Sequence, residues 1–351
     1  MQEIKSYVLV DDMNVRANLL PMTYVRPISE LRLGITTIRE KWERKLGAHC
    51  TWQTVEYLQE KFPCVIEGIP EYLPSNEVPG VGTVNHLWDI FQLNAKAIED
   101  DFVHITAGRV SQPISESCTV IGDASRIFIE DGATVEGAML NTKGGCIYIG
   151  KNAEVMEGAC LRGPIALCEH GVINMGTKVY GGTTIGPWCK VGGELNNVVM
   201  QAYSNKAHDG FLGNAVIGEW CNLGAGCVAS NLKNDYTEIK LWNYPAGRFL
   251  KTGLQFCGVI MGDHTKCGIN SMLNTATVLG VGVNIHGAGF PRPFVASFCE
   301  TGGGASGYSD VSMTKFFAIA ERMMARRHVQ LTEADKRIFY AIREIAENYR
   351  Q

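Results

Sequence analysis

Aliphatic residues recur at every sixth position through the middle of this 351-residue chain. The first run consists of Ile149, Val155, Leu161, Leu167, Ile173, Val179, Ile185 and Val191. Small residues follow most of them four positions later, at Ala153, Ala159, Gly171, Thr177, Thr183 and Cys189. A period of six fits neither an α-helix nor an amphipathic strand, but it is typical of a hexapeptide β-solenoid of short parallel strands. We therefore predict a mainly β fold in which the aliphatic residues stack inside the solenoid, the small residues form its corners, and about 18 residues make one coil.

The hexad register is interrupted twice. The step from Val191 to Ile217 is 26 residues, which is not a multiple of six, so we predict at least one insertion in that interval. His208 lies inside it. A second interruption follows Leu223, and residues 231–253 within it lack the hexad pattern. We expect this segment to project as a loop, and loops on a rigid scaffold are where binding and catalytic residues concentrate.

Different patterns flank the repeat on both sides. Residues 1–112 combine a strand signal, YVLVDD, with helical spacing over residues 26–43 and 87–102, which predicts a small α/β domain. The solenoid is expected to occupy residues 113–295 and a helical extension residues 296–351.

The helical extension is predicted to contain two helices. Residues 311–328 carry a dense apolar face, and a second helix follows with Thr332 and Asp335 at capping-box spacing. We expect these helices to cover the open end of the solenoid or to pack on a neighbouring subunit.

Composition excludes several classes of partner. The net charge is −4 with acidic and basic residues intermixed, so nothing favours nucleic acid or an anionic membrane surface. Neither a signal sequence nor an apolar span of membrane length is visible, which predicts a cytoplasmic location. The twelve cysteines are scattered without zinc spacing and are interpreted as reduced thiols. The basic run ARRH at residues 325–328 is interpreted as a solvated helix end.

One segment carries a specific family likeness. The stretch KAHDGFLGNAVIGEWCNLGAGCVASN, residues 206–231, resembles the acetyltransferase half of the bifunctional N-acetylglucosamine-1-phosphate uridyltransferase and glucosamine-1-phosphate acetyltransferase. Over its whole length the chain resembles a subgroup of such proteins found in Bacteroides-type bacteria. The resemblance implies a left-handed parallel β-helix, a homotrimer with active sites between subunits, and acetyl-CoA as cosubstrate. The hexad period itself does not reveal the hand of the coil.

The resemblance also implies roles for individual residues. The catalytic histidine of the family falls on His208, and a tyrosine that contacts the sugar phosphate falls on Phe211. The sugar-contacting asparagine falls on Asn222, the alanine that lines the acetyl-CoA site on Ala225, and the asparagine near the acetyl group on Asn231.

Several family positions are replaced here. The tyrosine expected after Asn231 is Leu232, and the lysine that grips the sugar phosphate falls on Asn196 or Asn197. We predict that other cations replace this lysine and that further cations bind the phosphates of coenzyme A. The candidates for the sugar phosphate are Arg162 and Lys206, and those for coenzyme A are Lys233 and Lys251.

The amino-terminal region has a partial likeness of its own. Residues 18–34, NLLPMTYVRPISELRLG, resemble the segment that follows the nucleotide-binding loop of sugar-phosphate nucleotidyltransferases. The loop itself corresponds to DDMNVRAN, which has no glycine to bring backbone N–H groups onto phosphates. We interpret the region as a truncated nucleotidyltransferase-like domain kept for folding, assembly or regulation. The alternative is a weak or altered nucleotidyltransferase that uses Arg16, Arg26 and Asp11 or Asp12 with Mg²⁺.

The leading functional hypothesis is an acetyl-CoA-dependent N-acetyltransferase that acts on an amino-sugar phosphate in nucleotide-sugar and cell-envelope precursor synthesis. Acetyl transfer to an amine needs a group that removes a proton near neutral pH, and a neutral histidine suits this role. The alternatives are sugar-1-phosphate nucleotidyl transfer by the amino-terminal region and a trimeric scaffold without catalysis. A zinc-dependent carbonic anhydrase on the same fold would need converging histidines, and the sequence has no HxxxxH pair; we predict no metal site in the solenoid.

Overall fold

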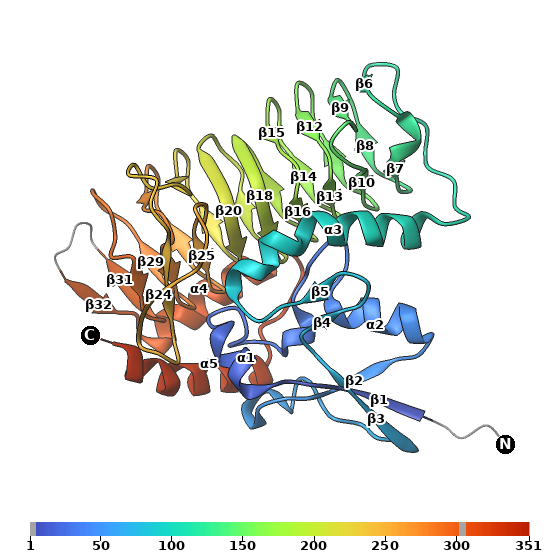
Figure 1. Cartoon of the computed structure of the whole chain (residues 1–351). Coiled ribbons are helices and arrows are strands. Elements are labelled where there is room, and N and C mark those ends of the chain that lie inside the picture. The colour runs from blue at the N-terminus through green and yellow to red at the C-terminus, as the bar shows by residue number, and fades with distance from the viewer. Residues whose placement is uncertain (1–4, 302–306, 351) are drawn as a thin grey trace.

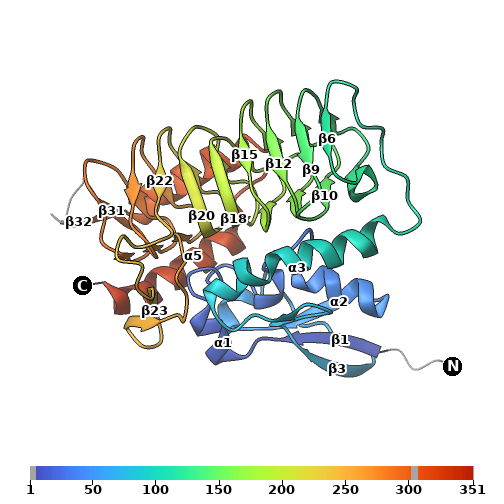
Figure 2. The ribbon, with the colours of Figure 1, turned by 45° about the horizontal axis from the view of Figure 1, so that its top comes forward.

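A left-handed parallel β-helix dominates the computed structural model, which describes residues 5–301 and 307–350. A small α/β region lies against one flank of the solenoid, and two carboxy-terminal helices lie near its far end (Figure 1). Seen obliquely, the coils form one continuous stack that the long helix α3 follows along its side (Figure 2). The mainly β fold predicted from the six-residue period is therefore confirmed.

Each coil contributes short strands to three parallel faces. Face 1 contains β7 (Ile127–Ile129), β10 (Ile147–Ile149), β13 (Ile165–Leu167), β16 (Thr183–Ile185), the ends of β18 (Glu194–Met200) and β20 (Phe211–Ile217), β25 (Ile260–Met261), β28 (Val278–Leu279) and β30 (Phe294–Val295). Face 2 contains β8 (Thr134–Val135), β11 (Glu154–Val155), β14 (Val172–Ile173), β17 (Lys190–Val191), β19 (Asn205–Lys206), β21 (Asn222–Leu223), β26 (Lys266–Cys267), β29 (Asn284–Ile285), β31 (Cys299–Thr301) and the antiparallel β32 (Tyr308–Asp310). Face 3 contains β6 (Thr119–Ile121), β9 (Met139–Asn141), β12 (Cys160–Arg162), β15 (Lys178–Val179), the starts of β18 and β20, β22 (Val228–Ala229) and β27 (Met272–Leu273).

The hexad residues form the core of the solenoid. On face 2, Val155 pairs with Ile173 and Ile173 with Val191, and all three side chains are buried. Burying an aliphatic side chain contributes about 1.5–3 kcal/mol. Because such residues recur on all three faces through most of the coils, this stack stabilises the wall.

Aromatic residues form a ladder along the corner between faces 1 and 2. His170, Trp188, Tyr203, Trp220 and His264 occupy successive coils, and all have left-handed backbone angles with φ between 54° and 61°. A left-handed conformation costs a non-glycine residue about 1–2 kcal/mol. Stacking offsets this cost, since the His170–Trp188 and the Tyr203–Trp220 ring centroids are each 4.1 Å apart. We call this ladder the aromatic corner.

The amino-terminal region is built on a small parallel sheet. Its elements are β1 (Lys5–Val10), α1 (Met13–Asn18), α2 (Ile38–Leu46), β2 (Cys50–Gln53), β3 (Ile69–Pro74), the β4–β5 hairpin (Glu77–Val78 and Gly82–Thr83) and α3 (Leu87–Thr106). The strand order is β2-β1-β3. The helix α3 joins this region to face 1, where the Asn94 amide donates to the carbonyl oxygen of Gly182 at 2.7 Å.

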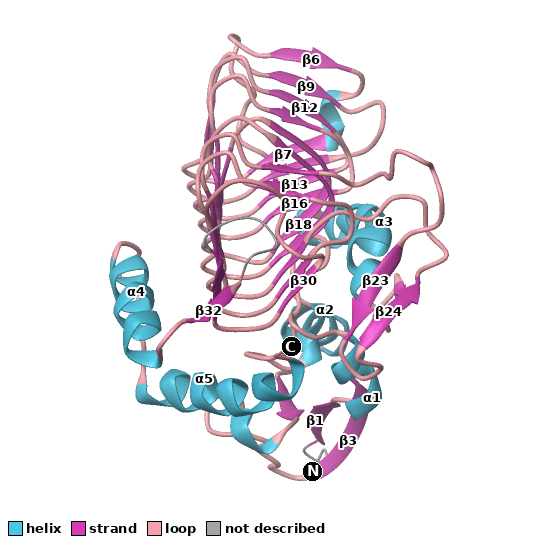
Figure 3. Ribbon diagram, turned by 90° about the vertical axis from the view of Figure 1, so that its left-hand side faces the viewer, coloured by secondary structure: helices cyan, strands magenta, loops and turns pink. Residues whose placement is uncertain are grey.

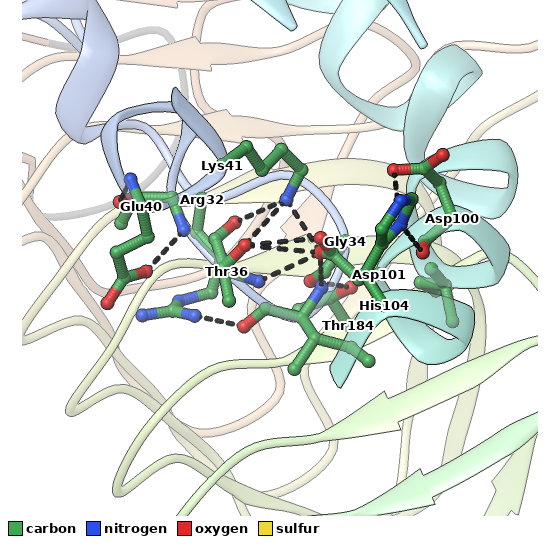
Figure 4. A network of polar contacts seen from close by, with 12 residues as sticks. Arg32, Gly34, Thr36, Glu40, Lys41, Asp100, Asp101, His104 and Thr184 are labelled. Atoms are coloured by element: carbon green, nitrogen blue, oxygen red, sulfur yellow. Dashed lines mark hydrogen bonds and ion pairs between the residues drawn. The ribbon is translucent and has the colours of Figure 1, made fainter. Parts of the chain in front are cut away.

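A buried carboxylate interrupts the helix predicted over residues 26–43. Only α2 forms there as an α-helix, because Gly34 adopts a φ of +83° and a Cβ at that position would lie 2.6 Å from Oδ2 of Asp101. The Asp101 side chain accepts hydrogen bonds from the backbone N–H of Ile35 at 2.8 Å and from Lys41 Nζ at 2.6 Å (Figure 4). Thr184 on face 1 donates to the Gly34 carbonyl oxygen at 2.9 Å, so the loop before α2 is fixed against the solenoid.

The carboxy-terminal helices are α4 (Met313–Ala325) and α5 (Glu333–Ala346), and the predicted Thr332–Asp335 capping box is present. The prediction that they cover the open end of the solenoid is wrong. They pack along the aromatic corner instead, where Phe316 of α4 lies 5.5 Å from His264 and 4.8 Å from Phe339 of α5, measured between ring centroids. Figure 3 shows α4 standing beside the coils and α5 lying beneath them.

The segment after Ala229 leaves the solenoid, as predicted, and folds into the hairpin β23–β24 (Lys240–Asn243 and Arg248–Lys251). Its aromatic residues return toward the body of the protein: the Trp242 ring stacks on Phe294 at 4.1 Å, and the Tyr244 ring lies 4.9 Å from Tyr349. Among the described helices, none is long and apolar enough to span a membrane.

Candidate active site

His208 lies at the corner where face 2 turns into face 3. Residues 207–210 connect β19 to β20 there, and the His208 side chain is exposed. The predicted insertion in this interval is wrong: the wall is continuous, since Lys190 pairs with Asn205 and Glu194 pairs with Phe211. The register is lost because the preceding corner is shortened to Gly192 and Gly193. The four-residue corner at residues 207–210 thus stacks on the two-residue corner at Gly192 and Gly193.

Glycine is required at this junction by close contact. A Cβ on Gly192 would lie 2.3 Å from the Ala207 carbonyl oxygen, and one on Gly210 would lie 2.0 Å from the Cys227 carbonyl oxygen. Real Cβ atoms do not approach backbone oxygens so closely, so a side chain at either position must displace the corner that carries His208.

Lys206 lies inside the solenoid rather than at its surface. It pairs with Val191 on face 2 and so occupies an inward position that aliphatic residues fill in neighbouring coils, and its side chain is fully buried. Its ammonium donates to the carbonyl oxygen of Gly192 at 3.2 Å and to that of His208. Burial lowers the pKa of Lys206. The structure therefore replaces the predicted phosphate contact with an internal anchor for the His208 backbone.

Ala225 occupies the same corner one coil further on. The Gly226 N–H donates to the Asp209 carbonyl oxygen at 3.1 Å, so the loop of His208 and the NLGAG turn lie against each other. The N–H groups of Gly224 and Cys227 are also bonded, to carbonyl oxygens at 2.9 and 3.3 Å. The backbone N–H of Ala225 has no acceptor within residues 5–301 and 307–350, and Ala225 is exposed to solvent.

Phe211 and Asn231 converge on Gly213 from two sides. A Cβ on Gly213 would meet the Asn231 amide nitrogen at 2.4 Å and the Phe211 ring at 2.7 Å, so both side chains lie directly over this glycine. The Asn231 amide donates to the Asn214 side chain at 2.8 Å, which fixes its orientation at the base of the projecting loop. These two predicted site residues are therefore neighbours in the fold.

Asn222 faces a separate cavity between face 2 and α4, with a volume of about 590 Å³. The cavity is lined by Lys190, Tyr203, Asn205, Ala207, Trp220, Asn222, Lys266, Ile319, Arg322, Met323, Arg326 and Arg327. Ala207 directly precedes His208, so this cavity and the exposed corner are adjacent. We call it the face-2 cavity.

Three predicted cations do not gather around His208. Arg162 lies on β12, three rungs from β20 on face 3, which is about 14 Å at the spacing of neighbouring strands. Lys233 donates to the Glu238 carbonyl oxygen at 2.9 Å, and Lys251 forms an ion pair with the Glu238 carboxylate at 3.2 Å. Both loop lysines therefore bind within the projecting loop itself.

The predicted residues of an amino-terminal nucleotide site are used for structure. Asp11 is buried and accepts hydrogen bonds from Arg16 at 3.0 Å, Thr54 at 2.6 Å, Ser75 at 2.7 Å and the Ile28 N–H at 3.0 Å. These four donors leave the carboxylate little capacity for a cation.

The two other candidates of that region are also occupied. Asp12 caps α1 by accepting from the N–H groups of Asn14 and Val15. Arg26 is buried against Asp263, with a shortest nitrogen–oxygen distance of 2.5 Å. The donor set therefore does not fit a magnesium–nucleotide complex, and no group of three or more potential metal ligands occurs among the described residues.

Sequence comparisons relate the chain to sugar nucleotidyl transferases and to bifunctional proteins that contain such an activity. The family model for sugar nucleotidyl transferases matches residues 7–77. The chain is 29% identical over 140 residues to the bifunctional protein GlmU of Trichodesmium erythraeum, which covers 39% of this chain and 25% of the relative. The predicted resemblance to the bifunctional uridyltransferase and acetyltransferase family is confirmed.

Two further relatives also match part of the chain. Identity is 26% over 193 residues to GlmU of a Cyanothece species, covering 53% of this chain and 35% of the relative. It is 29% over 93 residues to a bifunctional sugar-1-phosphate nucleotidylyltransferase/acetyltransferase of Sulfurisphaera tokodaii, covering 26% of this chain and 23% of the relative. The chain thus spans about a quarter to a third of the length of the curated relatives that it matches.

Sequence reasoning missed the cationic lining of the face-2 cavity. Lys190 and Lys266 each directly precede an inward hexad residue, Val191 and Cys267, so the hexad register itself places them on the outer surface of face 2. The basic run at residues 325–328 gave the second signal, but the sequence did not show that α4 lies over that face.

Proposed function

We propose that this protein transfers the acetyl group of acetyl-CoA to the amino group of an amino-sugar phosphate, with His208 as the general base. The proposal depends mainly on one observation: the exposed His208 corner adjoins the NLGAG turn, whose Ala225 N–H has no acceptor among the described residues. A proton acceptor and a hydrogen-bond donor at one edge are the two groups that direct acyl transfer requires.

The chemistry proceeds by direct attack. The amine nitrogen attacks the thioester carbonyl carbon while the His208 imidazole takes the amine proton. The Ala225 N–H donates to the oxygen of the resulting tetrahedral intermediate, where negative charge develops. The carbon–sulfur bond then breaks, the amide forms, and the imidazolium returns its proton to the departing thiolate. Lys206, bonded to the His208 carbonyl oxygen, keeps the base in place.

We further propose that the site is completed between the subunits of a homotrimer. Support comes from apolar side chains that are exposed on face 3 and on the corner of His208. They are Met139, Met175, Val228, Ile269 and Met272. A soluble protein seldom exposes such a row unless another surface covers it, and a second copy packed there would adjoin His208 and Phe211.

A thiol-release assay with acetyl-CoA and glucosamine 1-phosphate tests the catalytic proposal. We expect His208→Ala to lower kcat by about 10²- to 10⁴-fold, the usual contribution of a general base. His49→Ala is the matched control, because the His49 side chain is fully exposed in the amino-terminal region. If His208→Ala and His49→Ala release thiol at the wild-type rate, His208 is not the base.

A further inference from the structure

The face-2 cavity has an unusual balance of charge. Five cationic side chains line it, and no aspartate or glutamate does. Lys190 and Lys266 come from the solenoid, whereas Arg322, Arg326 and Arg327 come from the end of α4. The two groups therefore line the same cavity.

None of these five cations forms an ion pair with a carboxylate in the part of the chain that the structure describes. Other arginines of the carboxy-terminal helices are paired: Arg337 with Glu60 and Arg343 with Asp310. Even Glu321, on α4 itself, lies 3.4 Å from Lys336 of α5 rather than beside the cavity. Like charges around a low-dielectric space repel one another, so this arrangement favours a bound anion.

The helix dipole accounts for only part of the arrangement. Cations are favourable near a helix carboxy terminus, which explains why arginines occur in the last turn of α4. It does not explain why they face Lys190 and Lys266, which belong to a different element and raise the positive potential at the same place.

Polar and aromatic groups complete the cavity wall. Asn205 and Asn222 are paired neighbours on β19 and β21, and both line the cavity. The Asn205 side-chain oxygen is buried and has no partner among the described residues. Tyr203 and Trp220 form the adjacent wall with their stacked rings. Amides and a flat aromatic surface are suited to the hydroxyl groups and the apolar face of a sugar ring.

We propose that the face-2 cavity binds the acceptor, with its phosphate held by the α4 arginines together with Lys190 and Lys266. This inference rests on the proposed acetyl transfer and specifies how its acceptor is recognised. The sugar hydroxyls bind Asn205 and Asn222, and the amino group lies toward Ala207 and so toward His208. Arginines of α4 thereby replace the sugar-phosphate lysine that is absent at Asn196 and Asn197.

The environment of Lys266 adds a pH dependence to this site. Its Nζ donates to the His264 carbonyl oxygen at 2.8 Å, and burial lowers the pKa of Lys266 to about 8. The groups near it are Cys221 and His264 of the solenoid and the other four cations of the cavity. Because the charged form binds the phosphate, affinity should fall as the pH rises through about 8.

Calorimetric titration of the full chain with glucosamine 1-phosphate, without acetyl-CoA, tests the inference. We expect the double variant Arg322→Ser, Arg326→Ser to bind at least tenfold more weakly, because it loses two charged donors to the phosphate. Both side chains are exposed, so their loss leaves the fold intact. The control Arg337→Ser removes an arginine of α5 outside the cavity and should bind like wild type. Unphosphorylated glucosamine should bind weakly to all of them, and thermal unfolding verifies that each variant is folded.

Two outcomes would overturn the inference: wild-type affinity in the double variant, or no binding of glucosamine 1-phosphate by a protein that acetylates it. A third outcome separates the two proposals. If binding depends on Arg322 and Arg326 but no thiol is released, the anion site stands and the acetyl transfer does not. Inorganic phosphate as competitor distinguishes recognition of the phosphate from recognition of the sugar. If the arginines bind the phosphate group, inorganic phosphate should displace glucosamine 1-phosphate from the wild-type protein but not from the double variant.

Discussion

Replacing Lys206 with methionine separates the two roles that this side chain combines. The methionine keeps an unbranched apolar chain at an inward position of the solenoid and removes the ammonium. The carbonyl oxygens of Gly192 and His208 then lose their donor. The wall keeps its filling, whereas the corner that carries His208 loses its anchor.

The magnitudes indicate that stability should change little and activity much. Each hydrogen bond from a charged donor contributes about 1.5–3 kcal/mol. Against this, holding a cation in the interior costs several kcal/mol. The two effects cancel to within about 2 kcal/mol for Lys206→Met. Lys206→Ala also leaves a cavity, which costs about 2–5 kcal/mol. Loss of the anchor should lower kcat by about 10²-fold, the effect of a displacement near 1 Å.

Urea unfolding followed by tryptophan fluorescence, together with the thiol-release assay, measures both quantities. We expect Lys206→Met to unfold near the wild-type midpoint with a much lower kcat, and Lys206→Ala to unfold at lower urea. A methionine variant as unstable as the alanine variant would refute the balance of energies. A methionine variant with full kcat would refute the anchoring role.

Three further changes probe the junctions of the molecule. Arg26→Met leaves Asp263 buried without its partner and should lower the free energy of unfolding by about 3–5 kcal/mol, measured in urea; a loss below 1 kcal/mol would contradict this reasoning. Lys266→Met removes a group whose pKa is about 8 when folded and 10.5 when unfolded, so the charged lysine opposes folding below pH 8. The variant's stability advantage over wild type should therefore shrink by about 2–3 kcal/mol between pH 7 and pH 10, and a constant difference would disprove the burial effect. Gly210→Ala places a Cβ against the Cys227 carbonyl oxygen at a φ of +128°, so it should abolish acetyl transfer and lower the unfolding free energy by about 1–3 kcal/mol; unchanged kinetics would show that the corner can move.

The period of six was sufficient to predict the solenoid because each hexad makes the same demand on packing. Val155, Ile173 and Val191 stack as that pattern requires. The pattern was less reliable where a step shortened. The lost register before Ile217 came from shortened steps, one of them at the two-residue corner, and not from an insertion. The inward positions there are Val191, Leu195, Met200, Lys206, Leu212 and Ile217, and the total residue count alone does not reveal which of the steps are short.

The position of single polar residues was harder to predict. Lys206 pairs with Val191 and so points into the interior, although it lies outside the hexad register. Lysine so seldom occupies such a position that the sequence suggested a surface role. Gly34 ended a helix that apolar spacing had predicted, because the buried Asp101, far along the chain, approaches its backbone. Both cases depend on partners that local sequence does not reveal.

The amino-terminal region, which is similar to sugar nucleotidyl transferases over residues 7–77, uses its candidate nucleotide-site residues in contacts within the protein. Two of the polar residues that resemble catalytic ones make inward contacts: Asp11 joins the ends of the sheet, and Arg26 reaches Asp263 on the solenoid. Asp12 is exposed and caps α1. A carboxylate that must bind magnesium cannot also accept four protein donors, and an arginine that must bind triphosphate cannot remain in a buried ion pair. The cations of α4 and face 2 differ from these residues, because they lack carboxylate partners among the described residues and so remain available to an anion. We infer that binding capacity lies where charge is unpaired, which places the chemistry on the solenoid and makes the amino-terminal region its structural partner.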